Sequence, residues 1–404
     1  MTNQPIPLNI LFICNKSPWP ASEGGPIAMN MLIEGMVEAG HKVKVLAANT
    51  NKYSVEPKKI PVEYQEKTGI ELVYIDLSIK PFAAFANLFT NKSYHVERFI
   101  SADFDKKLIE ILQNTAFDIV QIETVYLSPY IGTIRQNSKA KIILRAHNIE
   151  HLIWGRITES TKNPIKKAYL SHLSRTLKNY ETGILKYYDG IVPISDQDAG
   201  YFEKVSDTPV LPASFGIHPK SLKTVHDKPV DNALFHIGSM NWIPNEEGIR
   251  WFIDEAWPLI SMKNPSLKVY LAGREMPQWL SKLKIPNVEV VGEVPDAQEF
   301  IQSKAISIAP LFSGSGIRIK IIESMAMGKA VISTKIGAEG IHYTDGQNIL
   351  IANTAGEFSK AATYLYENPA KSKEIGENAR KLILEKHNSE KIIQTLISFY
   401  QEIL

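Results

Sequence analysis

Residues 305–334 read AISIAPLFSGSGIRIKIIESMAMGKAVIST, and this stretch decides the fold that we predict. It begins with a short apolar run, Ala305–Ala309, which is typical of a buried strand. A proline ends the run, and the Gly-rich segment Ser313–Gly316 allows backbone N–H groups to approach a ligand closely. Apolar residues then recur at helical spacing over Ile317–Gly328, and Ala330–Ser333 reads as a second strand. Strand, Gly-rich loop, helix and strand form a unit that binds ligands in α/β proteins.

Two cations, Arg318 and Lys320, lie at the start of this helix, and Glu323 follows one turn later. A helix N-terminus already carries about half a positive charge, so cations there weaken the helix but strengthen an anion site. This favours a phosphate ligand. The alternative is a surface i,i+3 pair of Lys320 with Glu323 beside a solvated Arg318, and spacing alone leaves both interpretations open. The loop lacks the third Gly of a dinucleotide site, and the chain has no GxxxxGK[ST] motif.

This segment resembles the donor site of the retaining GT-B-fold glycosyltransferases of family GT4, the glycogen-synthase-like group 1. Their pattern has two glutamates eight positions apart, and here Glu323 is followed by SMAMGKAV, as the second glutamate requires. The resemblance implies that Glu323 binds the ribose hydroxyls of a sugar nucleotide. Ser315 stands where the family has its first glutamate. Ser315 and Gly316 belong to the sub-pattern Gly-x-Gly-x-Arg-x-Lys-x-x-Glu and are expected to contact the donor.

Composition limits the class of protein. A chain of 404 residues is long enough for two domains, and 44% hydrophobic with 22% charged residues is ordinary for a soluble globular protein. A net charge of +2 does not predict nucleic-acid binding. The single cysteine, Cys14, lies in an apolar run, so no disulfide framework is expected. No run of 18 apolar residues and no signal-type N-terminus occurs, and a cytoplasmic enzyme is therefore expected.

The N-terminal part predicts a right-handed βαβ unit. Leu8–Cys14 and Lys42–Ala47 read as strands, and a helix between them starts at the pair Gly24 and Gly25. The resemblance implies that these two glycines face the diphosphate and the acceptor. The alternative is a tight turn with no ligand.

A later predicted strand, Lys141–Ala146, is followed directly by His147-Asn148-Ile149-Glu150-His151. The spacing His-x-x-Glu-His matches a zinc-peptidase motif, but that motif must lie within a helix, and His147 falls at a strand end. We therefore expect no metal site. The resemblance implies that His147 faces the transferred sugar. The alternative is an imidazole that bonds loop backbone.

Two further segments allow two interpretations each. Pro81–Phe89 is apolar, and the resemblance places it on the acceptor side, sometimes against a membrane surface; the alternative is packing onto the sheet. Ile157–Tyr188 is helical and basic. Its charges indicate a solvated helix face or a weak attraction to anionic lipid.

The first strand of the second domain is expected to begin near Ala233, with Gly238 and Asn241 in the turn that follows it. The family commonly has an Arg and a Lys in this turn to hold the diphosphate, and this chain has neither. Our hypothesis is that Arg318 and Lys320 supply that charge. The resemblance also places Glu293 in the segment whose backbone contacts the nucleobase of the sugar nucleotide.

The fold class predicted is α/β, specifically GT-B, with two Rossmann-like parallel-sheet domains facing across a cleft. Residues 1–213 form the acceptor-side domain, on which a C-terminal helix at 388–404 packs, and 214–387 bind the nucleotide sugar. The function expected is sugar transfer from a nucleotide sugar to a hydroxyl of a glycan, a lipid-linked sugar or a small molecule. By resemblance it proceeds with retention and needs neither metal nor a cofactor beyond the co-substrate.

In this hypothesis His147, Arg318 and Lys320 are catalytic, and no nucleic-acid partner is expected. Peripheral contact with the inner face of a membrane is a further expectation. Two alternatives remain: a nucleotide-sugar epimerase of the same fold, and a non-catalytic sugar-binding protein of two hinged domains.

Overall fold

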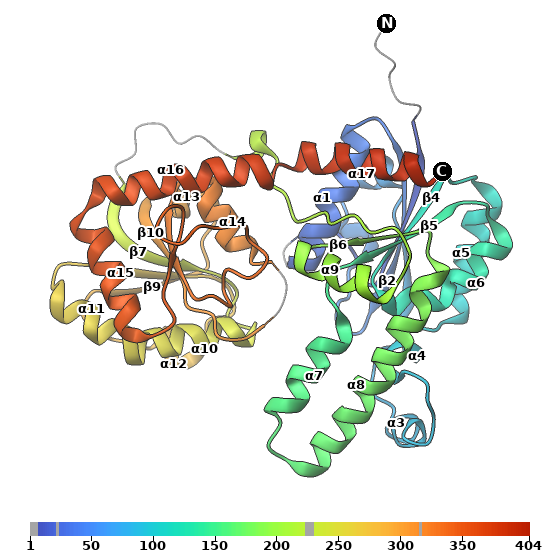
Figure 1. Ribbon diagram of the computed structural model, residues 1–404, viewed down its shortest axis with the longest axis horizontal. Coiled ribbons are helices and arrows are strands. Elements are labelled where there is room, and N and C mark those ends of the chain that lie inside the picture. Colours follow the sequence, from blue (N-terminus) through green and yellow to red (C-terminus); the bar gives the residue numbers. More distant parts are fainter. Residues whose placement is uncertain (1–6, 22–23, 223–229, 315–316) are drawn as a thin grey trace, which may run out of the picture. The chain divides into compact units, whose positions relative to one another are not determined.

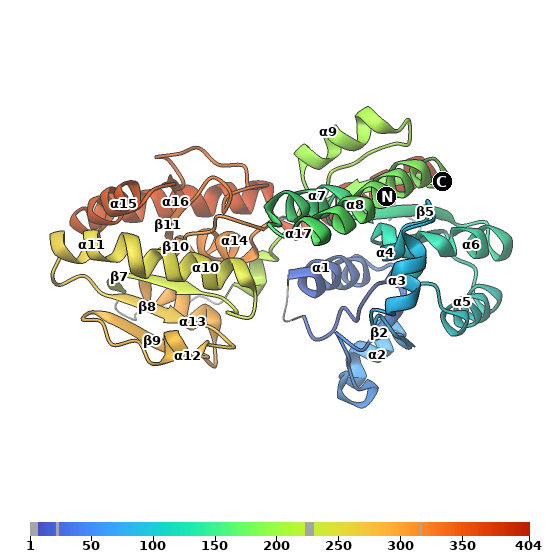
Figure 2. The same ribbon diagram turned by 90° about the horizontal axis from the view of Figure 1, so that it is seen from below.

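The computed structural model describes residues 7–21, 24–222, 230–314 and 317–404. The chain forms two compact units. The first runs to Ser214 and includes Glu390–Leu404, and the second is Phe215–Ser389. Each unit contains a six-stranded sheet with helices on both of its faces (Figure 1, Figure 2).

In the first unit all strand pairs are parallel, and the strand order is β3-β2-β1-β4-β5-β6. The strands are β1 Asn9–Cys14, β2 Lys42–Thr50, β3 Glu71–Ile75, β4 Ile119–Glu123, β5 Lys141–Ala146 and β6 Gly190–Pro193. The α-helices of this unit are α1 Gly24–Glu38, α2 Val62–Thr68, α3 Pro81–Asn87, α4 Tyr94–Glu97, α5 Ala102–Asn114, α6 Ile131–Asn137, α7 Glu150–Ser160, α8 Pro164–Ile184, α9 Asp196–Val205 and α17 Ser389–Ile403.

Strand β1 shows why the central strands of these sheets appear in the sequence as continuous apolar runs. Leu11 and Ile13 pack on one face, in a core that includes residues of α5. Ile10 and Phe12 pack on the other face with residues of α1 and α17. Because helices cover both faces of a parallel sheet, β1 is buried at every position from Ile10 to Cys14.

The second unit repeats the same arrangement, with parallel strands in the order β12-β11-β10-β7-β8-β9. The strands are β7 Asp231–Ile237, β8 Val269–Ala272, β9 Val288–Gly292, β10 Lys304–Ala309, β11 Ala330–Ser333 and β12 Leu350–Ile351. The α-helices are α10 Ile243–Trp251, α11 Trp257–Lys263, α12 Gln278–Ser281, α13 Ala297–Gln302, α14 Ile319–Ala326, α15 Ala355–Glu367 and α16 Pro369–Lys386.

The strand order places a topological switch point in each sheet. In the first unit the chain changes direction between β1 and β4, and in the second between β7 and β10. Ligands of open α/β sheets bind beyond the carboxyl ends of the strands at such points. The residues that follow these strands are therefore the first candidates for a functional site.

Two segments differ from the sequence-based expectation. The region from Asn51 to His95 contains the short helices α2 and α4, which the sequence analysis did not predict, and α3, which falls in the apolar segment Pro81–Phe89. The helical segment expected over Ile157–Tyr188 is broken into α7 and α8. The break arises because Asn163 caps α8, with its side chain accepting from Lys166 N, and Pro164 occupies the first helical position. Among the helices of the described residues, none has the length and apolarity needed to cross a bilayer.

Candidate functional site

Next to the switch point of the second sheet, the loops after β7 and β8 approach so closely that a side chain on Gly273 would collide with backbone. Gly273 follows β8 with φ +147°, and a Cβ placed on it would lie 1.8 Å from the carbonyl oxygen of Gly238. A Cβ on Gly238, after β7, would lie 2.9 Å from Asn245 Nδ2. The carboxyl ends of β7 and β8 thus present backbone without side chains, as a site that binds a phosphate through backbone groups requires.

Asn245, in the first turns of α10, connects this backbone to the start of α14. Its Nδ2 donates to Ser239 O at 2.8 Å, and its Oδ1 accepts a hydrogen bond from Lys320 Nζ. Asn245 is buried. Sequence reasoning missed this residue, although an asparagine in the helix that follows a Gly turn was a visible signal.

Arg318 and Lys320 both lie beside the indole of Trp242. Arg318 is the N-cap residue of α14 and is buried, with its guanidinium carbon 5.3 Å from the Trp242 ring centre. Lys320 Nζ lies 6.0 Å from the same ring. Gly314 has φ +99°, and a Cβ there would lie 2.9 Å from Trp242. The structure therefore brings Gly314, Arg318 and Lys320 together around Trp242, which the sequence analysis did not single out, while Lys320 is connected to the turn at Gly238 through Asn245.

Burial changes the protonation of this site. Burial, together with the neighbouring charge of Arg318, lowers the pKa of Lys320 to about 7. Burial raises the pKa of Glu323 to about 7. The pKa of His236, at the end of β7, is also lowered by its burial and by the charge of Lys320. An anionic ligand would relieve the charge repulsion, so the arrangement favours binding of a phosphate group.

The other residues that the sequence analysis assigned to the donor site are either exposed or outside the described residues. Asn241 is exposed and its Oδ1 accepts from Ser239 Oγ at 2.9 Å. Glu293 follows β9 and is exposed. Ser315 and Gly316 lie outside the described residues. The alternative interpretation was a surface pair of Lys320 with Glu323. In the structure Lys320 Nζ donates to Asn245 Oδ1 and not to Glu323.

In the first unit, His147 follows β5 and contacts Glu123 at the end of the neighbouring strand β4. His147 Nε2 lies 2.6 Å from Glu123 Oε2. The other carboxylate oxygen accepts from Gln121 Nε2, and Gln121 Oε1 accepts from the hydroxyl of Tyr400 on α17. A carboxylate bonded to one ring nitrogen fixes the orientation of the imidazole. The partner of His147 is thus a buried carboxylate, where the alternative interpretation expected loop backbone.

Arg145 is buried beside the same carboxylate. Its Nη1 donates to Val192 O at 3.2 Å and Pro193 O at 3.3 Å, while Nε and Nη2 have no hydrogen-bond partner among the described residues. Burial lowers the pKa of Arg145, and the charge of Glu123 acts in the opposite direction. The carboxylate therefore compensates a buried cation in addition to holding His147.

The pair Gly24 and Gly25 begins α1, as the sequence predicted. A Cβ on Gly25 would lie 3.1 Å from Cε of Lys16, and Lys16 Nζ lies 4.3 Å from the Tyr53 ring centre. The glycine thus allows a lysine side chain to lie against the N-terminus of α1, where the helix dipole and the ammonium group carry the same sign.

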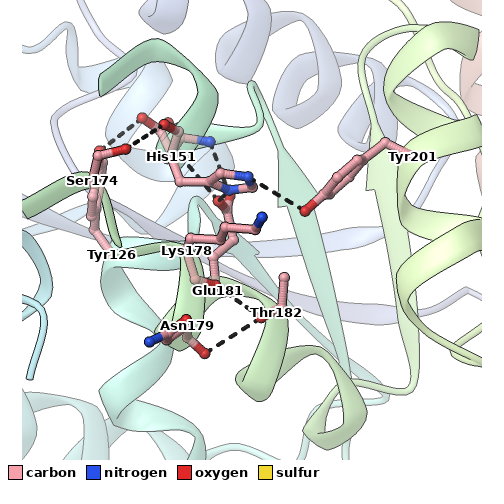
Figure 3. Close-up of polar contacts among 9 residues, drawn as sticks. Tyr126, His151, Ser174, Lys178, Asn179, Glu181, Thr182 and Tyr201 are labelled. Carbon is pink, nitrogen blue, oxygen red and sulfur yellow. Dashed lines mark hydrogen bonds and ion pairs between the residues drawn. The ribbon is translucent and has the colours of Figure 1, made fainter. Parts of the chain in front are cut away.

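His151, the last residue of the His-x-x-Glu-His spacing, has a different carboxylate partner from His147. Figure 3 shows it between Glu181 and Tyr201. Glu181 accepts from the backbone N–H groups of Glu150 and His151 at 3.0 and 3.1 Å, and lies 2.6 Å from His151 Nδ1. Glu181 of α8 therefore caps the N-terminus of α7, and the two histidines do not share one site. Within the described ranges, no group of three or more His, Cys, Asp or Glu side chains could hold a metal ion.

We expect Glu181→Ala to lower the free energy of unfolding by about 2–4 kcal/mol, because three donors, two of them buried, lose their acceptor. Glu181→Gln should lose less, since its amide oxygen still accepts. Urea unfolding measures both. Glu159→Ala, which removes an exposed carboxylate in the last turn of α7, is the control and should change stability by less than about 0.5 kcal/mol. Equal stabilities of Glu181→Ala and the control would refute the capping role.

A comparison with known protein families gives a match within the second unit. Residues 231–368 match the family model described as Glycosyl transferases group 1. This segment includes all six strands of the second sheet and the helix that carries Arg318 and Lys320. A protein described as an uncharacterized 44.6 kDa protein in the cps region of Klebsiella pneumoniae is 24% identical over 396 residues, which cover 96% of this chain and 98% of that protein.

Solved structures match both units. Sucrose-phosphate synthase from Thermosynechococcus elongatus has a TM-score of 0.70 at 16% identity, over 98% of this chain and 99% of that chain. Anabaena Alr3699/HepE in complex with UDP has a TM-score of 0.69 at 13% identity, over 98% and 100%, and the same protein with UDP-glucose has a TM-score of 0.67. The fold is GT-B. The predicted fold class is confirmed, and the comparisons support a glycosyltransferase of this fold.

Proposed function

We propose that this protein is a retaining, metal-independent glycosyltransferase of family GT4, which transfers a sugar from a nucleotide sugar to a hydroxyl group. The observation that carries the proposal is the placement of Arg318 and Lys320. Lys320 bonds Asn245, which in turn bonds the glycine turn after β7, and Arg318 lies beside Trp242, all within the segment that matches the group 1 model. Two cations and a helix N-terminus at that position suit a diphosphate leaving group.

Each group has a defined task in the second unit. Arg318 and Lys320 stabilise the negative charge that develops on the departing diphosphate. Gly238 and Gly273 leave room for the diphosphate to approach backbone N–H groups. Glu323 accepts hydrogen bonds from the ribose hydroxyls, which positions the donor and involves no proton transfer. Asn241 and Glu293 contribute polar contacts to the donor.

In the first unit, we assign His147 to a hydrogen bond with the sugar near its reacting carbon. Glu123 holds one ring nitrogen, so the imidazole presents its other nitrogen in a fixed direction. Gly24 and Gly25 face the diphosphate and the acceptor. Retention follows if the departing phosphate takes the proton of the incoming hydroxyl on the same face of the sugar.

Uridine diphosphate is the nucleotide that we propose to test first, because Anabaena HepE was solved with UDP and with UDP-glucose. The acceptor proposed is a hydroxyl of a glycan, of a lipid-linked sugar or of a small molecule. Product analysis separates this function from that of an epimerase. A transferase releases nucleoside diphosphate only with an acceptor or water, whereas an epimerase interconverts the nucleotide sugar and releases none.

We expect UDP to stabilise the protein by about 2.7 kcal/mol at 100 times its dissociation constant, as measured by thermal shift. Glu323→Ala should reduce the UDP response and leave the response to inorganic pyrophosphate unchanged, because pyrophosphate has no ribose. Glu367→Ala, an exposed carboxylate at the end of α15, is the matched control and should respond like the wild type. If no nucleoside diphosphate shifts the wild-type protein, the donor-site assignment fails.

A further inference from the structure

Lys320 is a buried cation that depends on one neutral hydrogen-bond acceptor. Arg318, the N-cap residue of the same helix α14, carries a like charge, and burial together with this charge lowers the pKa of Lys320 to about 7. Within the described ranges, Lys320 forms no ion pair with a carboxylate, and the acceptor that its Nζ bonds is Asn245 Oδ1. A hydrogen bond to the charged form of a buried group favours that form. The amide of Asn245 therefore determines how readily Lys320 keeps its proton.

The amide of Asn245 can present only its oxygen to Lys320. Its Nδ2 donates to Ser239 O at 2.8 Å, and a Cβ on Gly238 would lie 2.9 Å from the same nitrogen. If the amide were flipped, its oxygen would face the Ser239 carbonyl and its NH₂ group would face the ammonium group, and both contacts would be repulsive. Asn245 is 5% exposed, and its backbone N–H donates to Trp242 O at 2.9 Å in the first turn of α10. The turn after β7 and the start of α10 therefore hold the oxygen in place.

The titratable groups around Lys320 give it no carboxylate partner. His236, on β7, is fully buried, and its Nδ1 lies 3.0 Å from Ile308 O, which requires the ring proton on Nδ1. Burial and the charge of Lys320 lower the pKa of His236, so this ring stays neutral. Glu323, one turn further along α14, is not the acceptor of Lys320, and burial raises its pKa to about 7. With Arg318 repelling the ammonium group, the favourable polar contact is the one with Asn245.

An amide suits this position better than a carboxylate. A carboxylate would hold the ammonium group more strongly, but its charge would cancel that of Lys320 and repel a diphosphate. An amide favours the charged form of the lysine and adds no charge of its own. The residue type at position 245 therefore leaves the cation available to an anionic ligand.

We propose that Asn245 is a positioning residue of the donor site, which keeps Lys320 charged and holds its ammonium group beside the glycine turn after β7. The ligand, a nucleoside diphosphate, rests on the proposed function. The effect on the charge of Lys320 does not, because it exists in the protein alone. Two variants separate this role from packing. Asn245→Ala and Asn245→Asp both remove the donor to Ser239 O, and they differ in the group that faces Lys320.

The first test is urea unfolding of the full-length protein without ligand, from about pH 5 to pH 10. The pKa of Lys320 is about 7 in the folded chain and its ordinary value is 10.5, so the wild-type free energy of unfolding rises with pH between these values. In Asn245→Ala the ammonium group loses its acceptor, and we expect the rise to begin about one pH unit lower. In Asn245→Asp a carboxylate stabilises the ammonium group, and the rise should begin at least about one pH unit higher. In a Lys320→Met background, Asn245→Ala should leave the pH dependence unchanged.

Asn264 provides the matched control. It is 4% exposed, and its Nδ2 donates to Thr363 Oγ1 at 2.7 Å and to Ile260 O at 3.2 Å, so it is a buried amide whose hydrogen-bond partners include no cation. Asn264→Ala should lower the free energy of unfolding without moving the pH at which it rises. Its affinity for UDP should stay within about twofold of the wild type, because distant sites act independently.

The second test is calorimetric titration with UDP at about pH 6 and pH 8. Asn245→Ala should bind UDP about tenfold more weakly than the wild type at the higher pH, but only about twofold more weakly at the lower pH, where about half of its Lys320 is still charged. Asn245→Asp should lose at least about tenfold in affinity at both pH values, although its Lys320 is charged, because the carboxylate repels the diphosphate.

Two results would overturn the proposal. One is a wild-type pH dependence of stability in both Asn245 variants. The other is a shift in the same direction in both, which would mean that the lost bond to Ser239 O acts through packing. Opposite shifts in a protein that binds no nucleoside diphosphate would support the effect of Asn245 on Lys320 and refute the donor site that the proposed function assigns.

Discussion

Replacing Lys320 with methionine should stabilise the protein and remove its affinity for nucleoside diphosphates. At pH 7 we expect the free energy of unfolding to rise by on the order of 3 kcal/mol, because burial and Arg318 lower the pKa of Lys320 to about 7. Methionine fills similar volume without the cost of burying a charge. Loss of one of two cations should weaken binding of the diphosphate by about 10²-fold or more.

The pH dependence of stability has a definite sign for this residue. The pKa of Lys320 lies near 7 in the folded chain, below the ordinary 10.5 that applies when unfolded. Between these values the unfolded chain holds a proton that the folded chain has released, so the wild-type free energy of unfolding rises with pH from about 7 to 10.5. This contribution should be absent from Lys320→Met. Diphosphate binding to the wild type should weaken above pH 7, as Lys320 loses its charge.

Lys329 provides a matched control for this experiment. It lies just past the end of α14, and its pKa is lowered to about 8 by burial and by the charge of Lys304. Its Nζ donates to Gln302 O at 2.7 Å. Lys329→Met should therefore also remove a buried charge, yet it should leave UDP affinity within about twofold of the wild type. Urea unfolding from pH 6 to 10 and calorimetric titration with UDP measure both properties. Wild-type affinity in Lys320→Met would exclude Lys320 from the donor site.

The second large effect concerns Glu123. We expect Glu123→Gln to destabilise the protein by about 3–5 kcal/mol, because the substitution leaves the buried guanidinium of Arg145 without its negative neighbour. Arg145→Met should destabilise it too, since Glu123 then lacks a cation. The double variant should recover part of the loss, because both charges have gone.

A double-mutant cycle in urea measures the coupling between these two residues. A coupling energy near zero would mean that Glu123 and Arg145 act independently. His147→Ala is the control, because it removes the partly exposed imidazole and keeps both buried charged side chains, Glu123 and Arg145, so its stability should stay close to the wild type. In transfer assays, the His147→Ala and Glu123→Gln variants should both transfer sugar more slowly than the wild type, since each substitution disturbs the imidazole that we assign to the sugar.

Most strands could be predicted because central strands of a parallel sheet are buried on both faces and read as apolar runs. Leu8–Cys14 and Ala305–Ala309 are examples, and each overlaps a strand of the structure. The short helices α2 and α4 could not be predicted from periodicity, because helices of seven and four residues contain too few turns to show it. Their conformation depends on packing against neighbouring elements.

The sequence by itself determined the local elements of the candidate site. These are a Gly-rich loop before a helix with Arg318 and Lys320, and a histidine at a strand end. Only the tertiary structure decided the partners, which are Asn245 for Lys320, 75 positions away, and Glu123 for His147. Backbone preferences and apolar periodicity act over a few residues and are legible in the chain. Which side chains meet is set by strand order, and their pKa values depend on burial, which exists only after folding.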